Sequence, residues 1–314
     1  MAEVPAPRIA VLLPCYNEGA AIAGTVAAFR AALPDAAVYV FDNNSRDDTV
    51  DRARAAGAIV RTERMQGKGH VVRRMFADVD ADIYVLADGD ATYDASAAPE
   101  MIRLLLAESL DMVVGARQSE VDAAYRRGHR LGNRVLTGIL ARLFGRSFSD
   151  ILSGYRVFSR RFVKSFPVLS AGFEIETEIS VHALELRMPV AEVVTAYGAR
   201  PEGSASKLST YSDGFRILST IATLFRLERP VLFFGAIGAL LGLVSILLAV
   251  PLVVTYAKTG LVPRLPTALL STGLMILAFL NGFCGLILDT VVRGRREVRR
   301  LAYLGLPAPG NPAR

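Results

Sequence analysis

Residues 83–90, Ile-Tyr-Val-Leu-Ala-Asp-Gly-Asp, join a short apolar run to two carboxylates that follow it directly. An apolar run of this length predicts a buried β-strand, here over 83–87. Asp88 and Asp90, separated by Gly89, then stand at the end of that strand. Two carboxylates in such a place can hold a hard divalent cation that also takes oxygens from a diphosphate. Acidic turns are common, however, so the triplet needs support from its neighbours.

Strand and helix signals alternate on both sides of this stretch. Further short apolar runs predict strands at 9–13, 38–41, 58–60, 112–114 and 190–196. Helical patterns occupy 20–33, 67–79, 95–109, 130–144 and 175–186. Short strands that alternate with helices favour an α/β fold with a mostly parallel sheet.

Polar groups follow three of the predicted strands. They are Asn17-Glu18 after the first strand, Asp42-Asn43-Asn44 after the second, and Asp88-Gly89-Asp90 after the strand at 83–87. In open α/β sheets, ligands bind at the carboxyl ends of the strands. The sequence therefore predicts one pocket formed by these three groups, with a spacing that suits a nucleotide.

These motifs resemble those of glycosyltransferase family 2, which has a Pro-x-Tyr-Asn-Glu opening, an acidic residue after the second strand and an Asp-x-Asp triplet. The chain also resembles, more narrowly, the polyprenyl-phosphate (dolichyl-phosphate mannose or glucose) sugar synthases. The segments that carry this narrower resemblance are Asp150-Ile-Leu-Ser153-Gly154-Tyr155-Arg156 and Arg200-Pro-Glu-Gly203-Ser-Ala-Ser206-Lys207. It covers roughly residues 8–230 and implies a GT-A-type nucleotide-binding domain that moves a sugar from a nucleotide-sugar to a polyprenyl phosphate.

The resemblance also implies roles for individual residues. A nucleotide-sugar site would contain Pro14, Tyr16, Asn17, Glu18, Asp42, Asn44, Lys68, Asp88, Gly89 and Asp90. An acceptor-phosphate site would contain Arg117, Arg127, Arg130, Asn133, Ser153, Arg156, Arg200 and Ser206. The catalytic groups would be Asp88, Asp90, Arg117, Arg200 and Lys207, and the two aspartates would hold Mg²⁺ or Mn²⁺.

Several of these assignments leave alternatives open. The second-strand motif reads Asp-Asn-Asn-Ser where many relatives have two consecutive acids. This difference weakens any prediction of whether the nucleotide carries uridine or guanosine. A UDP-sugar is favoured over a GDP-sugar. The arginines at 126–130 are too dense for all to act, and each is equally explained as a solvated or lipid-facing charge. One carboxylate among Glu174, Glu176 and Glu178 touches the donor sugar or the acceptor loop, or else the cluster is a solvated helix face.

The implied chemistry suits the residues present. A phosphate acceptor is anionic near neutral pH, so its oxygen can attack the anomeric carbon without a strong general base. The protein's task is then positioning and charge neutralisation, for which arginine, lysine and a metal are appropriate. The three histidines have no metal-ligand spacing. A single displacement predicts inversion at the anomeric carbon.

The C-terminal third carries two uncharged runs, 231–257 and 265–288. Each exceeds the roughly 20 residues that cross a hydrocarbon core. Arginines flank the outer ends of the pair, so both ends are expected in the cytoplasm. The expected organisation is a catalytic domain at 1–208, an interfacial amphipathic helix at 209–230, a two-helix transmembrane hairpin at 231–292 (spans at about 231–257 and 265–290) and a basic tail at 293–314. The protein is thus expected in the inner (plasma) membrane, with its catalytic domain and both termini cytoplasmic.

Other classes fit less well. The net charge of +6 reflects arginines that cluster where anionic lipid headgroups would attract them. No nucleic-acid-binding pattern accompanies this charge. A transferase that extends a lipid-linked or surface glycan and a non-catalytic membrane scaffold are the alternatives. The expected partners are the nucleotide-sugar, the polyprenyl phosphate and membrane lipids, in a pathway for cell-envelope glycans or lipid modification. A homo-oligomer through the spans is left open.

Overall fold

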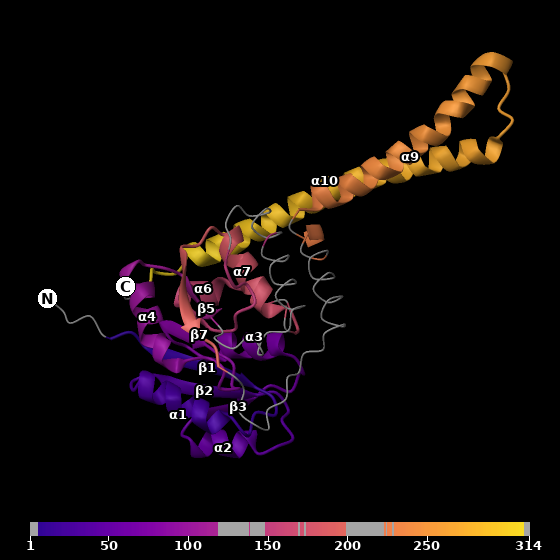
Figure 1. Cartoon of the computed structure of the whole chain (residues 1–314). Helices are drawn as coiled ribbons and strands as arrows, with labels where there is room; N and C mark the ends of the chain where they lie inside the picture. Colours follow the sequence, from indigo (N-terminus) through magenta and orange to yellow (C-terminus); the bar gives the residue numbers. More distant parts are fainter. Residues whose placement is uncertain are drawn as a thin grey trace. The chain divides into compact units, whose positions relative to one another are not determined.

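A computed structural model of the chain describes residues 6–118, 138, 148–168, 170–172, 174–198, 223, 225–227 and 229–310. The chain divides into two compact units (Figure 1). One consists of residues 1–214 together with 299–314, and the other of residues 215–298. The first contains the sheet and the second a pair of long helices. The predicted helices at 130–144 and 209–230 fall almost wholly outside the described residues.

A 7-stranded sheet organises the first unit, in the order β3-β2-β1-β4-β6-β5-β7. Every neighbouring pair is parallel except those made by β6, which runs antiparallel to both β4 and β5. The predicted mostly parallel α/β sheet is confirmed. The strands are β1 (Ile9–Cys15), β2 (Ala37–Asp42), β3 (Ile59–Thr62), β4 (Ile83–Leu86), β5 (Met112–Gln118), β6 (Arg156–Ser159) and β7 (Val190–Ala196).

Helices pack on both faces of this sheet (Figure 1). On one face α1 (Ile22–Ala32), α2 (Thr49–Ala55) and α4 (Ala98–Ala107), preceded by the 3₁₀ turn η1 (Ala95–Ala97), contact one another. On the other face lie α3 (Lys68–Asp78), α6 (Arg160–Ser165) and α7 (Ile175–Glu185). The central strands are therefore buried on both sides, which is why they read as continuous apolar runs rather than alternating ones.

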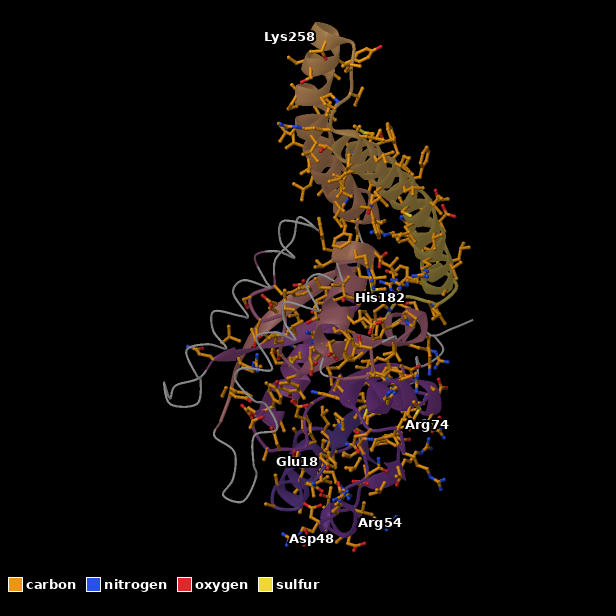
Figure 2. The ribbon with its side chains drawn as sticks, turned by 90° about the vertical axis from the view of Figure 1, so that its right-hand side faces the viewer. Glu18, Asp48, Arg54, Arg74, His182 and Lys258 are labelled. Carbon is orange, nitrogen blue, oxygen red and sulfur yellow. The ribbon has the colours of Figure 1, made fainter. Side chains whose placement is uncertain are left out.

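The two faces have different cores. Val11 and Leu13 of β1 join a mainly aliphatic cluster with α1 and α4. The opposite face is aromatic: Phe162 stacks on β6, and His182 packs against Phe162 and Phe166. Burial, together with a smaller effect of the nearby Arg299, lowers the pKa of His182 to about 3. The His182 ring, labelled in Figure 2, is therefore neutral and packs in the core.

The reversed strand β6 determines which segments reach the site. Parallel strands β1, β2 and β4 deliver their carboxyl ends to one edge of the sheet. Because β6 runs the opposite way, its beginning lies beside the end of β4, with Arg156 opposite Leu86. Residues just before β6 therefore meet the Asp88 loop. The sequence did not predict β6, since this strand is only four residues long and opens with an arginine.

Residues 299–310 belong to the first unit, although most of the helix that precedes them does not. Tyr303 donates its hydroxyl hydrogen to Asp111 Oδ2 at 2.8 Å, and Arg161 lies over the Tyr303 ring. Arg299 pairs with Glu185 at 2.7 Å. The C-terminal segment is thereby fastened to the edge of the sheet opposite the carboxyl ends, where β5 begins. The sequence had suggested only a basic tail here.

The second unit contains a hairpin of α9 (Pro230–Thr259) and α10 (Leu265–Leu304) as far as residue 298. Lys258, near the end of α9, is labelled in Figure 2. Ser245 and Ser271 each donate a hydroxyl hydrogen to the other's backbone carbonyl, at 2.8 and 3.0 Å. A Cβ at Gly238 would lie 2.8 Å from Ala278 O. Such small residues let two apolar helices approach closely and satisfy polar groups between them.

Candidate active site

The loops after β1 and β2 are joined by backbone-to-side-chain hydrogen bonds. Asn17 takes a positive φ of 52°; its N–H donates to Ser45 Oγ at 2.8 Å and its Oδ1 accepts from Arg46 N at 2.8 Å. The N–H of Glu18 donates to Thr49 Oγ1 at 2.8 Å. The structure thus brings two of the predicted polar groups together. In Figure 2 Glu18 lies inside the unit, whereas Asp48 and Arg54 project from the α2 region.

Asn43 organises the approach to α3, a part that the sequence did not assign to it. Its Nδ2 donates to the carbonyls of Glu63 and Met65 at 2.9 and 2.8 Å, and its Oδ1 accepts from Gly67 N at 2.7 Å. Its two neighbours make other hydrogen bonds. The Asp42 carboxylate accepts from Ser45 N, and Asn44 donates to Arg64 O at 2.9 Å. The predicted places of Asp42 near the base and of Asn44 in the nucleotide-sugar site stay predictions.

Lys68 lies between two carboxylates. Its Nζ is 2.5 Å from Asp88 Oδ1 and 2.6 Å from Glu176 Oε1. The side chains of Lys68 and Glu176 are only 10% and 9% exposed, against 30% for Asp88. Burial lowers the pKa of Lys68, but the two carboxylates raise it by more, so the net pKa is raised and the amine stays charged. Lys68 therefore holds Asp88 in place, and its predicted contact with the donor stays a prediction.

Two glycines bracket Lys68 because backbone passes within contact distance of both. A Cβ at Gly67 would lie 2.2 Å from Ala171 O, and one at Gly69 would lie 2.1 Å from Ser170 O. Gly67 also has a φ of 134°, which disfavours other residues. The sequence Gly67-Lys68-Gly69 carried this signal, since a lysine between two glycines at a helix start marks a close backbone approach.

The Asp-Gly-Asp triplet lies directly after β4, as predicted. Asp90 is buried, and its Oδ1 accepts from Thr92 Oγ1 at 2.6 Å and from Thr92 N at 3.2 Å. Within the described ranges no three His, Cys, Asp or Glu residues are grouped so that they could share a metal. Mg²⁺ is commonly held by one or two carboxylates together with substrate phosphates. The partly exposed Asp88, with Asp90 fixed beside it, fits that kind of partial ligand set.

Gly154 closes the site from the β6 side. Its N–H donates to the Tyr93 hydroxyl at 2.8 Å. A Cβ on this residue would lie 2.9 Å from Asp88 Oδ2 and 3.2 Å from Lys68 Nζ. Ser153 is fully buried, and its hydroxyl donates to Gly115 O at 2.6 Å. Gly154 and Tyr93 are site residues that sequence reasoning missed.

Replacing Gly154 by Ala should lower sugar transfer at least about tenfold, because the new methyl group would displace Asp88 Oδ2, and a small misplacement at a reacting centre can cost up to about 10²-fold in rate. Initial rates measured at saturating donor would show it. Gly24→Ala is the matched control, since a Cβ there meets nothing within 4 Å. A Gly154→Ala enzyme as active as the control would show that the contact is not tight in the working enzyme.

Arg117, near the end of β5, forms a bidentate ion pair with Asp150. Its Nε and NH2 atoms lie 2.6 and 2.8 Å from the two oxygens of Asp150. The guanidinium also lies 5.4 Å from the centre of the Tyr197 ring. This ties the end of β5 to the loop before β6 and to the end of β7, all at the carboxyl edge. Its predicted acceptor contact stays a prediction.

Arg156 lies in the interior of the sheet unit. It is fully buried, and its guanidinium donates to Ser153 O at 2.9 Å, Ile151 O at 2.6 Å, Glu176 O at 3.1 Å and Ser180 Oγ at 2.9 Å. Burial, offset in part by Glu176, lowers its pKa to about 10, so it remains charged at neutral pH. In this position it supports the loop before β6 and the start of α7. The acceptor contacts predicted for Ser153 and Arg156 stay predictions.

The remaining predicted residues have mixed placements. Pro14, Tyr16 and Gly89 lie with the loops described above, at the ends of β1 and β4; a Cβ at Gly89 would meet Cys15 Sγ. The other predicted acceptor-site and catalytic residues lie outside the described residues; they are Arg127, Arg130, Asn133, Arg200, Ser206 and Lys207.

Comparison with known proteins defines the class. Residues 10–166 match the model of glycosyl transferase family 2. The chain therefore belongs to glycosyltransferase family 2. The predicted GT-A-type fold of its sheet unit is confirmed. It is a glycosyltransferase.

Two curated relatives come from Haloferax volcanii. Glycosyltransferase AglJ is 35% identical over 238 residues, which cover 75% of this chain and 78% of that protein. Dolichyl-phosphate hexose transferase is 26% identical over 229 residues, covering 73% of this chain and 99% of the relative. Among solved structures, glucosyl-3-phosphoglycerate synthase from Mycobacterium tuberculosis with Mn²⁺, UDP-glucose and phosphoglyceric acid superposes with a TM-score of 0.57, at 26% identity over 70% of this chain and 79% of that one.

Proposed function

We propose that the protein transfers a sugar from a nucleotide-sugar, favouring UDP over GDP, to a polyprenyl phosphate such as undecaprenyl phosphate. The observation that carries this proposal is the Asp88–Asp90 pair, held by Lys68 and Thr92 at the carboxyl edge of a family 2 sheet, in a chain that also has two long apolar helices. The acidic pair suits the donor's diphosphate, and the helices suit a lipid acceptor.

The donor side rests on the position of the two aspartates. Solved relatives with Mn²⁺ and UDP-glucose, and with Mg²⁺ and UDP, support a divalent cation here. Asp88 and Asp90 would hold it, and when bound it would offset the charge on the departing nucleoside diphosphate. Lys68 binds Asp88 Oδ1, which leaves Asp88 Oδ2, on the Gly154 side, as the oxygen available to the cation.

The acceptor side rests on charge. A phosphate oxygen of the acceptor attacks the anomeric carbon, the bond from that carbon to the diphosphate breaks, and the configuration inverts. Cationic and polar groups would bind the acceptor phosphate and need not remove a proton. We propose Arg117, Arg127, Arg130, Asn133, Arg200 and Ser206 for this part, with Ser153 and Arg156 in support and Lys207 as a catalytic group.

The membrane part rests on the hairpin. α9 and α10 are both long and apolar enough to cross a bilayer, and only 11% of the apolar stretch of each helix is buried. A core helix of a soluble protein would be mostly covered instead. Arginines at the outer ends of the hairpin favour a cytoplasmic position for the catalytic domain and both termini, at the inner (plasma) membrane. The dolichyl-phosphate transferase relative supports a lipid-phosphate acceptor for this site.

The full chain, purified and reconstituted in lipid vesicles, should convert undecaprenyl phosphate to a lipid-linked monosaccharide with one donor from a panel of UDP- and GDP-sugars and Mg²⁺ or Mn²⁺. Mass spectrometry of the lipid fraction would identify both product and sugar. 3-Phosphoglycerate is the competing acceptor to include. Transfer to a sugar acceptor alone would favour glycan extension, and absence of nucleotide binding would favour a scaffold; either result would overturn the proposal.

A further inference from the structure

We propose that Glu176 is a positioning residue for the donor site: it holds Lys68, and its negative charge offsets the positive charge of that lysine beside Asp88. The inference rests on the proposed function, because it concerns how Asp88 meets a cation and a nucleoside diphosphate. It assigns a definite part to one carboxylate of a cluster that the sequence could equally assign to a solvated helix face.

Glu176 is held rigidly at the start of α7. Its backbone carbonyl accepts from Arg156 NH2 at 3.1 Å and from Ser180 Oγ at 3.0 Å. Its side chain reaches Lys68 Nζ at 2.6 Å, across 108 residues of sequence. Both ends of the residue are therefore fixed, and the side chain is directed to the lysine that touches Asp88.

The charge balance explains what this arrangement does. Lys68 carries one positive charge, which is shared between Asp88 and Glu176 at nearly equal distances of 2.5 and 2.6 Å. Glu176 adds a negative charge of its own, so that Lys68, Asp88 and Glu176 together carry one net negative charge instead of none. Asp88 keeps a net negative field toward solvent, where its side chain is 30% exposed. In a poorly solvated site such a single charge alters cation affinity strongly.

A second observation sets Glu176 apart from a residue kept for stability. In the described part of the chain its Oε2 is buried and has no hydrogen-bond partner. A buried carboxylate oxygen left in this state is costly to the fold. Glutamine would supply the same hydrogen bond to Lys68 without the charge, so the acid is explained by the charge it brings to this site.

The test is the Mn²⁺ dependence of UDP binding, measured by calorimetry on the full chain. Glu176→Gln should raise the half-saturating Mn²⁺ concentration about tenfold, while UDP binding without metal is not weakened. Glu176→Asp, which retains the charge, should stay within about threefold of the natural protein. Glu100→Gln is the matched control, because Glu100 pairs only with Arg103 on the exposed face of α4 in the structure.

If Glu176→Gln does not fold, Glu176→Asp decides alone: because it retains the charge beside Lys68, its half-saturating Mn²⁺ concentration should stay within about threefold of that of the natural protein. Unchanged Mn²⁺ dependence in Glu176→Gln, or an equal loss in Glu176→Asp, would overturn the inference alone. A natural protein that binds no UDP even with Mn²⁺ would overturn the proposed function and the inference with it.

Discussion

Replacing Asp90 by Ala is expected to lower sugar transfer by at least about 10²-fold, the scale for losing one preorganised electrostatic group at a reacting centre. Asp90 is buried beside Asp88 and is fixed by Thr92, so its carboxylate is set in place before any ligand binds. The measurement is the initial rate of lipid-linked sugar formation at saturating donor and acceptor, together with the thermal midpoint.

Asp51→Ala is the matched control for this variant. Asp51 makes only a surface pair in α2 and its side chain is 86% exposed, so the rate should not change. An Asp90→Ala protein that folds and transfers sugar as fast as the control would remove the acidic pair from the mechanism. The donor site would then have to be sought elsewhere along the carboxyl edge.

Replacing Arg156 by Ala is expected to cost at least about 3 kcal/mol of folding free energy. Hydrogen bonds from a charged group contribute about 1.5–3 kcal/mol each, and the truncation also leaves a cavity. Arg156 donates to three backbone carbonyls and to Ser180, all in the interior. For a unit of this size the thermal midpoint should fall by at least about 6 °C.

The same variant separates two roles for Arg156. An arginine that only binds the acceptor phosphate would leave the thermal midpoint in place and raise the KM for the acceptor. Arg103→Ala, on the exposed surface of α4, is the control and should shift stability by less than about 0.5 kcal/mol. A stable Arg156→Ala protein with a raised acceptor KM would contradict the supporting role seen in the structure.

The parts of the site that could be predicted are those that follow parallel strands. Asn17, Asp42 and Asp88 each follow an apolar run within a few residues, and the order β2-β1-β4 makes those strand ends neighbours. Local pattern was sufficient because a parallel sheet gathers its carboxyl ends at one edge. β7, a mostly apolar segment that includes Glu192, was likewise predicted with its observed bounds.

The parts that could not be predicted depend on contacts between distant segments. The ion pair of Lys68 with Glu176 joins residues 108 positions apart, and nothing in either local pattern indicates the partner. β6 is too short and too polar at its start to resemble a strand, yet its reversed direction brings Gly154 to Asp88. Tyr303 likewise binds Asp111 across 192 positions, which a basic tail does not suggest.

A lipid phosphate as the acceptor's nucleophile can be distinguished from a lipid alcohol in a single comparison. The reconstituted chain is given its donor, Mn²⁺ and either undecaprenyl phosphate or undecaprenol, and lipid-linked sugar and released nucleoside diphosphate are measured together. We expect equal amounts of both products with the phosphate and neither with the alcohol. Comparable transfer to undecaprenol, or transfer to 3-phosphoglycerate with none to undecaprenyl phosphate, would contradict this expectation.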